Sequence, residues 1–360
     1  MNILHTETLK RWGGQQNRLL TEASGLMGRG HRVVIACHRG SILAQKAKEA
    51  VLPVYEVNMV KQNHLLTIPM LMRIIIREKV DIVSTHSSVD SWAGGIAAKL
   101  TGRRLVRFRH NLFPIGRDPL TRLIYTLPDR IITLSRAIED VLREGGIGKE
   151  KISVIPSCVD AERFTPAVED LREELHIDPG ILIIGNTSTF SQVKGYESLL
   201  RAFNRIGREV PCVLLFAGSI EEEGRKRCLG FIEENLRDRV LFLGHRDDVP
   251  RVLKTIDVFV YPSFMEGLGT ALLEAMTMKR AIALSDIPTF REFIDDTGNG
   301  LFFAAQDPDD MAEKVLLLLR DEGLRQRLGE HARSTALERF SPMRMLDLTE
   351  TTYREVLNAS

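Results

Sequence analysis

Short apolar segments with strand character alternate with segments of helical spacing along almost the whole chain. In the first part of the chain, strands are predicted at residues 3–5, 32–37, 51–57, 80–85, 105–109, 130–134 and 152–155. Helices between them are predicted at residues 16–28, 67–78, 91–100 and 136–144. A second series of strands follows at residues 181–184, 213–216, 240–243, 258–261 and 281–284. Because strands that alternate with helices form parallel sheets covered by helices, the sequence predicts an α/β protein.

The length of 360 residues exceeds what one hydrophobic core usually accommodates and predicts two domains. We place the boundary after Thr165, where the sequence becomes polar and charged. The predicted domains are residues 1–165 and 166–341, both of the doubly wound type. Residues 342–360 are predicted to form a final amphipathic helix.

The composition is typical of a globular protein in a reducing environment. Hydrophobic residues make up 44% of the chain and charged residues 27%. The four cysteines form no C-x-x-C pair, and no signal peptide or bilayer-spanning apolar stretch is recognisable. We therefore expect a cytoplasmic protein without disulfide bonds.

Charge is distributed unevenly along the chain. Residues 1–165 contain 25 basic and 15 acidic residues, whereas the remainder contains 24 and 33. This asymmetry is either chance variation between two domains or a sign that the first domain meets an anionic partner, such as a membrane surface or a phosphorylated acceptor. Nucleic acid is not expected as a partner, because aromatic residues make up only 6% and no nucleic-acid motif is present.

Residues 65–79 allow two interpretations. Leu, Ile and Met occupy much of this predicted helix, and Arg73, Arg77 and Lys79 lie near its end. We favour a core helix whose basic residues interact well with the helix dipole. A helix lying on a membrane surface is the alternative, and it would make the protein a peripheral one on the inner face of the membrane.

Two carboxylates stand eight residues apart across a glycine-rich turn. Glu266 is predicted on the loop after strand 258–261, and Glu274 in the second turn of the helix that follows. Gly267 and Gly269 allow a ligand to approach the backbone closely. Free N–H groups at a helix start suit a phosphate, and carboxylates accept hydrogen bonds from hydroxyls. A nucleotide sugar is a ligand of this kind.

Together with Tyr261-Pro262-Ser263 before it and Ala275-Met276 after it, this segment resembles the signature of retaining GT-B glycosyltransferases of family 4, also called glycosyltransferase group 1. The resemblance extends over nearly the whole chain and is densest from residue 185 to residue 300. It implies two Rossmann-like doubly wound domains that face each other across a cleft. It also implies that the last helix returns to the first domain.

The resemblance implies a donor site in the second domain. Glu274 would bind the ribose hydroxyls, and Glu266 would bind the hydroxyls of the donor sugar and orient it. The departing diphosphate would be stabilised by Lys194 and by the backbone N–H groups of Gly267, Leu268, Gly269 and Thr270.

The loop from Gly185 to Lys194 departs from the family pattern. Family members usually carry an arginine four or five residues before the lysine, and the two cations clamp the diphosphate. This chain has Thr189 and Phe190 in that region. Another cation, Arg246 or one from the first domain, is then expected to take the arginine's place.

The first domain is expected to carry the acceptor side. Gly13-Gly14-Gln15 resembles the family's N-terminal glycine loop, which borders the donor phosphate and the acceptor. A histidine in the position of His110 lies near the transferred sugar in the family, and His86 is a second candidate. Each histidine also allows a purely structural interpretation. Arg107 and Arg109 flank His110 and complete the predicted acceptor-side residues.

The resemblance implies a retaining transfer from a nucleotide-diphosphate sugar to a glycan or lipid-linked acceptor, as in cell-envelope polysaccharide or lipopolysaccharide biosynthesis. Asp247-Asp248 is more typical of a helix N-cap than of a metal site, so we expect no metal and no cofactor besides the donor. A GT-B phosphorylase, a nucleotide-sugar epimerase and a non-catalytic sugar-nucleotide binder are the alternatives.

Overall fold

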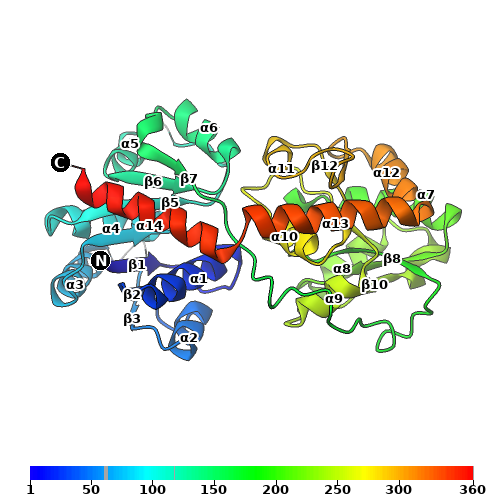
Figure 1. Ribbon diagram of the computed structural model, residues 1–360, viewed down its shortest axis with the longest axis horizontal. Coiled ribbons are helices and arrows are strands. Elements are labelled where there is room, and N and C mark those ends of the chain that lie inside the picture. Colours follow the sequence, from blue (N-terminus) through cyan, green and yellow to red (C-terminus); the bar gives the residue numbers. More distant parts are fainter. Residues whose placement is uncertain (61–63, 117, 360) are drawn as a thin grey trace. The chain divides into compact units, whose positions relative to one another are not determined.

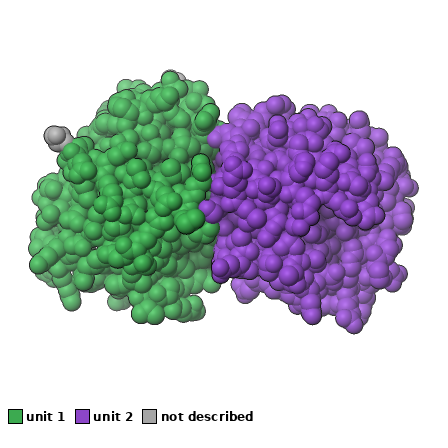
Figure 2. Space-filling view, in the orientation of Figure 1, with its two compact units in different colours: residues 1–158, 342–360 green, residues 159–341 purple. Residues whose placement is uncertain are grey.

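A computed structural model describes residues 1–60, 64–116 and 118–359 (Figure 1). The chain divides into two compact units (Figure 2). Unit 1 comprises Met1–Cys158 and Pro342–Ser360, and unit 2 comprises Val159–Ser341. The division thus falls after Cys158, whereas the sequence placed it after Thr165. Residues between these points pack within unit 2, where the N–H of Val159 donates to the carbonyl of Phe340 at 3.0 Å.

Unit 1 is built on a seven-stranded sheet in the order β3-β2-β1-β4-β5-β6-β7. All of its strand pairs are parallel, with β1 paired to β2 on one side and to β4 on the other. The strands are β1 Asn2–Glu7, β2 Arg32–His38, β3 Val54–Val57, β4 Ile82–Thr85, β5 Arg104–Arg109, β6 Arg130–Thr133 and β7 Ile152–Val154.

Helices cover both faces of the unit 1 sheet. They are α1 Gly14–Gly28, α2 Ile42–Glu49, α3 His64–Arg77, α4 Ser88–Leu100, α5 Pro119–Thr126, α6 Arg136–Glu144 and α14 Pro342–Asn358, with a short 3-10 turn, η2, at Lys149–Lys151. One core joins α1, α2 and α14 to the sheet, and another joins α3 and α4 to it. Helix α14 packs closely on α1 (Figure 1). The space beside Gly25 of α1 is so narrow that a Cβ there would lie 2.4 Å from the Leu346 side chain of α14.

Unit 2 repeats this architecture with a parallel sheet in the order β10-β9-β8-β11-β12-β13. Its strands are β8 Leu182–Asn186, β9 Cys212–Phe216, β10 Val240–Phe242, β11 Val258–Tyr261, β12 Ala281–Ser285 and β13 Leu301–Phe303. Its helices are α7 Tyr196–Glu209, α8 Glu222–Leu229, α9 Val249–Thr255, α10 Thr270–Thr277, α11 Pro288–Arg291, α12 Pro308–Arg320 and α13 Glu322–Arg339, with 3-10 segments η3 Gln192–Lys194 and η4 Glu234–Arg239.

The predicted fold class of two doubly wound parallel sheets is confirmed. The sequence analysis did not name helices α12 and α13, of 13 and 18 residues, nor the shorter elements α2, α5 and β13. Helix α2 begins after Ser41, whose hydroxyl accepts the N–H of Ala44 at 3.2 Å. Helix α5 begins after Asp118, whose carboxylate accepts the N–H of Thr121 at 2.8 Å. Strand β13 has three residues, which is too few for a periodic pattern.

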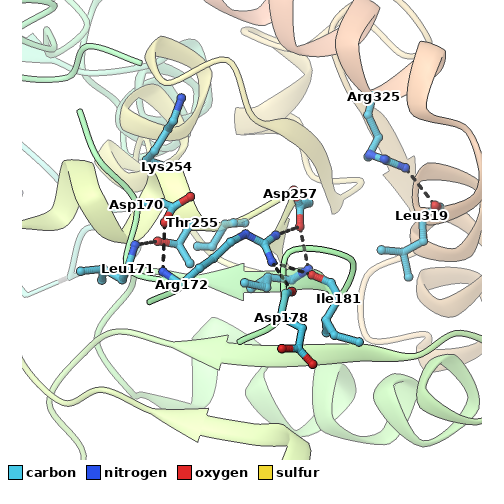
Figure 3. A network of polar contacts seen from close by, with 12 residues as sticks. Asp170, Leu171, Arg172, Asp178, Ile181, Lys254, Thr255, Asp257, Leu319 and Arg325 are labelled. Atoms are coloured by element: carbon cyan, nitrogen blue, oxygen red, sulfur yellow. Dashed lines mark hydrogen bonds and ion pairs between the residues drawn. The ribbon is translucent and has the colours of Figure 1, made fainter. Parts of the chain in front are cut away.

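A network of polar contacts connects the first segment of unit 2 to the edge of the sheet where its strands begin (Figure 3). The Arg172 guanidinium lies 2.8 Å from the Asp257 carboxylate and donates to the carbonyl of Ile181 at 2.8 Å. The same Asp257 oxygen accepts the N–H of Ile183 at 2.8 Å. Asp257 immediately precedes β11, and Ile181 immediately precedes β8, so the network aligns the starts of the two central strands.

We predict that Asp257→Ala lowers the free energy of unfolding by about 1–2 kcal/mol, because it leaves the N–H of Ile183 without its acceptor and removes the carboxylate that pairs with the Arg172 guanidinium. Urea denaturation measures this change. Asp238→Ala is the matched control, because Asp238 is exposed. Equal losses in the two variants would contradict a structural role for the network.

Candidate active site

Two loops of unit 2 meet at the carboxyl edge of its sheet, one after β8 and the other after β11. The N–H of Phe264 donates to the carbonyl of Val193 at 3.0 Å and ties the loops together. Gly195 has φ +67°, and a Cβ there would lie only 2.1 Å from the carbonyl oxygen of Pro262. Glycine is therefore required after Lys194, and its close contact brings Lys194 to the loop that carries Glu266.

Lys194 and Glu266, which the sequence predicted as donor-site residues, form an ion pair. The Lys194 ammonium donates to Oε1 of Glu266, and the hydroxyl of Tyr261 donates to the same oxygen at 2.8 Å. The Thr289 hydroxyl fixes the loop by donating to the carbonyl of Glu266 at 2.7 Å. The side chains of Lys194 and Glu266 are only 17% and 11% exposed. A shielded cation thus lies beside a shielded hydrogen-bond acceptor, and these groups match a phosphate and a sugar hydroxyl.

Glu274 lies in the second turn of α10, as predicted. Its half-buried carboxylate makes no hydrogen bond or ion pair with any residue that the structure describes. Burial raises the pKa of Glu274 to about 7, and the positive charge of Arg163 acts against this shift. The Glu274 carboxylate is therefore a hydrogen-bond acceptor without a partner among the described residues. Its negative charge is unfavourable in this buried position.

Helix α10 begins directly after the turn that carries Glu266. Gly269 adopts φ +87°, and a Cβ there would lie 2.8 Å from the Tyr261 ring, which explains the glycine. Among the residues that the structure describes, no side chain caps the start of α10. The first N–H groups of the helix therefore suit an anion, as predicted for the segment from Gly267 to Thr270.

The remaining donor-side residues of the prediction have structural contacts of their own. Phe190 stacks on Tyr196 with ring centroids 3.9 Å apart, and the Tyr196 hydroxyl approaches the carbonyl of Thr189 at 3.4 Å. Gly185 lies in β8, where a Cβ would come within 2.4 Å of the Ile256 side chain. An aromatic contact and close packing thus occupy the region in which the family usually has its arginine.

Arg246 is already engaged by carboxylates. Its guanidinium binds both oxygens of Asp248, at 2.7 and 2.6 Å, and lies 2.8 Å from Glu174. Within the described residues, no contact joins Arg246 to Lys194 or Glu266. The positive charge of Arg163 interacts with Glu274. Arg163 also donates to the carbonyl of Asp247 at 3.2 Å, and the sequence analysis did not single it out.

Unit 1 contains a row of three histidines behind the carboxyl ends of β1, β4 and β5. Nδ1 of His5 lies 3.0 Å from Nε2 of His86, and Nδ1 of His86 lies 3.4 Å from Nε2 of His110. Phe108 stacks on His86, with ring centroids 4.5 Å apart. Burial, and next the charge of Arg18, lowers the pKa of His110 to about 3, and burial similarly lowers the pKa of His5 and His86. The three rings are therefore neutral at pH 7 and can form a continuous hydrogen-bonded row.

The inner end of this row meets a buried ion pair. Nε2 of His5 lies 3.9 Å from the carboxylate of Glu22, which is 3.7 Å from the Arg18 guanidinium. The hydroxyl of Tyr353, on α14, donates to Glu22 at 2.8 Å. Sequence analysis singled out none of His5, Arg18 and Glu22, because their contacts with β1, α14 and the segment after β7 form only in the tertiary structure.

Glu7 holds the predicted glycine loop at the end of β1. One carboxylate oxygen accepts the N–H groups of Thr8 and Leu9, at 2.7 and 2.8 Å. The other accepts the side-chain amides of Gln15 and Gln16, on the first turn of α1 beside Gly13 and Gly14. Gln15 also donates to the carbonyl of His86 at 3.1 Å. The structure therefore brings together Gln15 and His86, two of the residues predicted on the acceptor side.

A second carboxylate, Asp90, lies behind Glu7. It accepts the hydroxyl of Thr6 and the N–H of His86, both at 2.7 Å. Burial, and next the charge of Asp90, raises the pKa of Glu7 to about 7. Neither acid was predicted. The capping-box spacing from Ser87 to Asp90 is the one local signal that could have indicated Asp90.

Arg107 and Arg109 both face Tyr125 on α5. The Arg107 guanidinium lies 3.8 Å from the centroid of the Tyr125 ring, and Arg109 donates to the Tyr125 hydroxyl. Arg109 also donates to the carbonyls of Asn111 and Phe113. These contacts order the segment after His110, and a direct contact of either arginine with an acceptor stays a prediction.

The fold is that of the GT-B class of glycosyltransferases. A model of the family described as Glycosyl transferases group 1 matches residues 167–335, and a model of Glycosyltransferase Family 4 matches residues 12–163. The chain belongs to this family of group 1, family 4 glycosyltransferases.

Similar proteins include an N-acetyl-alpha-D-glucosaminyl L-malate synthase of Bacillus anthracis, which is 28% identical over 78% of this chain and 76% of that protein. The UDP-Gal:alpha-D-GlcNAc-diphosphoundecaprenol alpha-1,3-galactosyltransferase of Escherichia coli is 25% identical over 99% of this chain and 97% of that protein. Among solved structures, Anabaena HepE in complex with UDP has a TM-score of 0.88 and 19% identity, and the match covers 99% of this chain and all of that one. This structural likeness confirms the fold.

We predict that Glu274→Gln raises the free energy of unfolding at about pH 8 by roughly 1–3 kcal/mol. The folded-state pKa of about 7 exceeds the ordinary value of 4.5, so the folded protein holds this proton more tightly than the unfolded chain. The ionised carboxylate therefore destabilises the fold above about pH 7, and this cost disappears as the pH falls towards 4.5.

Denaturation curves at about pH 8 and about pH 5 test this prediction. Glu338→Gln is the control, because Glu338 is exposed. A gain from Glu274→Gln that is the same at both pH values would show that the buried charge is not its cause.

Proposed function

We propose that the protein is a retaining glycosyltransferase that moves a sugar from a nucleotide-diphosphate sugar to a glycan or lipid-linked acceptor in cell-envelope polysaccharide or lipopolysaccharide biosynthesis. The observation that carries the proposal is the grouping of Lys194, Glu266, Glu274 and the uncapped start of α10 at one edge of the unit 2 sheet. It offers a cation and N–H groups to a diphosphate, and two carboxylates to hydroxyls. Glu274, which has no partner of its own, is assigned to the ribose.

The names of similar proteins support the choice of ligands. HepE was solved with UDP, and the Escherichia coli relative is named for UDP-Gal and a diphosphoundecaprenol-linked acceptor. The Bacillus anthracis relative is named for L-malate, a small acid. We assign a nucleotide-sugar donor to unit 2 and a lipid-linked or glycan acceptor to unit 1, where Gln15, His86 and His110 lie together. The same proposal places the protein in the cytoplasm, on the inner face of the membrane.

The proposed reaction keeps the anomeric configuration. The acceptor hydroxyl attacks the anomeric carbon from the face that the diphosphate leaves, the bond from that carbon to the diphosphate oxygen breaks, and a diphosphate oxygen takes the hydroxyl proton. Lys194 and the N–H groups of α10 stabilise the charge that develops on the diphosphate. His110, neutral at pH 7, positions the reacting sugar by hydrogen bonding and does not act as a cation. In this scheme no metal ion is needed.

A non-catalytic sugar-nucleotide binder is the second candidate function. The observation that favours it is the Thr189-Phe190 segment, where family members usually have the arginine of the diphosphate clamp. The engagement of Arg246 by Asp248 and Glu174 points in the same direction. The two candidates predict the same nucleotide binding and differ in sugar transfer.

We predict that one class of nucleoside diphosphate raises the thermal midpoint of the wild type, and that UDP is that class. Lys194→Ala and Glu274→Ala are expected to weaken its affinity by about 10- to 100-fold each, because each removes a hydrogen bond that involves a charged group. Lys226→Ala and Glu338→Ala are the controls, because both residues are exposed on other helices of unit 2. Binding that survives in both site variants would place the nucleotide elsewhere.

We also predict that sugar transfer survives a chelator and that the product keeps the anomeric configuration of the donor. NMR of the anomeric proton measures the configuration, and radiolabelled donor with diphosphoundecaprenol-linked acceptors measures the transfer. An inverted product, or activity that returns only when a divalent cation is added, would contradict the mechanism. Bound donor that stays intact with every acceptor would favour the non-catalytic binder.

A further inference from the structure

Helix α3 has two apolar sides, and only one of them packs on the core. Leu71 and Ile75 are fully buried in the core between α3, α4 and the unit 1 sheet. On the other side, Leu66, Met70 and Ile76 are 69%, 48% and 63% exposed. The preferred interpretation of a core helix therefore accounts for only half of this helix.

The exposed residues share one face. At 3.6 residues per turn, positions 66, 70, 73, 76 and 77 fall within an arc of about 120°. Arg73 and Arg77 are exposed and lie between the three apolar residues on this arc. We call these five residues the outer face of α3. The helix contains no aspartate or glutamate.

The surroundings of this face are positively charged. Arg73 makes no hydrogen bond or ion pair with any residue in the described part of the chain. The Arg77 guanidinium lies 3.8 Å from the carboxylate of Glu78, which Arg32 already binds. Lys79 follows and is exposed. Arg32 and Arg77 therefore share one carboxylate, while Arg73 and Lys79 are exposed and add further positive charge at this end of the helix.

This combination fits the boundary between water and an anionic lipid bilayer. Leu, Met and Ile side chains can enter the upper acyl region, while interleaved arginines reach the lipid phosphates. Single exposed apolar residues need no explanation, but three on one helix face with arginines between them indicate a binding surface. None of the helices in the described part of the chain is long and apolar enough to cross a membrane.

We propose that the outer face of α3 docks unit 1 on the surface of an anionic lipid bilayer. The helix lies parallel to the bilayer, with Leu66, Met70 and Ile76 inserted and Arg73 and Arg77 at the level of the lipid phosphates. This proposal is independent of the donor chemistry of unit 2, so it is tested without any sugar transfer.

Vesicle flotation of the full chain tests the proposal. The wild type is expected to float with vesicles of equal parts phosphatidylglycerol and phosphatidylcholine, to remain unbound with pure phosphatidylcholine, and to be released by salt. Arg73→Gln with Arg77→Gln is expected to lower the partition coefficient roughly 30-fold at low ionic strength. Leu66→Ser with Met70→Ser and Ile76→Ser is expected to abolish flotation.

Matched controls lie in unit 2. Leu317→Ser with Leu337→Ser removes apolar side chains that are 48% and 42% exposed, and Lys226→Gln with Arg227→Gln removes two exposed charges. Both controls are expected to float like the wild type. Every variant is expected to fold, because the altered side chains are exposed. A thermal midpoint near that of the wild type verifies this for each variant.

Three outcomes would overturn the proposal. The wild type could fail to bind anionic vesicles, or the α3 variants could bind as tightly as the controls. Light scattering could also show a wild-type dimer that the α3 substitutions convert to a monomer without any vesicle binding, and the outer face would then be an interface between two copies of the chain.

Discussion

The parallel pairing of all strands is the constraint on which the functional geometry depends. Because neighbouring strands run in the same direction, the loops that follow them emerge at one edge of each sheet. In unit 1 this edge gathers Glu7, His86 and His110 from the ends of β1, β4 and β5. In unit 2 it gathers the loops that carry Lys194 and Glu266. The opposite edge of the unit 2 sheet carries the Arg172–Asp257 network, so this structural network and the candidate site lie at different edges.

The buried ion pair of Arg18 and Glu22 connects three segments of unit 1. An ionised side chain in an apolar core is stable only when it is paired and hydrogen-bonded, so this pair fixes its neighbours. Glu22 accepts from Tyr353 on α14, and Arg18 donates to the carbonyls of Ile155 and Pro156. A helix from the end of the chain and the segment after β7 are thereby held against α1. The same burial keeps the histidine row neutral at pH 7, so hydrogen bonding is the polar interaction that the row can offer.

Unit 2 shows how residues of the candidate site lower the stability of their own fold. Gly195 and Gly269 occupy backbone conformations and spaces that other residues fit poorly, and their role is to bring Lys194 and α10 to the same place. Lys194 and Glu266 satisfy each other in the folded chain. Glu274 has no such partner, and its raised pKa records that its charge is unfavourable in this position. A ligand that donates hydrogen bonds to Glu274 would remove that cost, which links stability to binding.

The sequence by itself determined the two α/β units, the family, and the positions of Glu266 on a loop and Glu274 in the second helical turn. These features follow from local patterns of apolar residues and glycines, which can be recognised within short segments. The tertiary structure decided the partners. Arg246 is engaged by Glu174, which is 72 positions away, and Glu22 meets a tyrosine that is 331 positions away. It also decided that one side of α3 stays exposed, although the helix is apolar on both. Long-range contacts decide which charge is paired and which surface is covered, and periodicity within one segment carries no information about them.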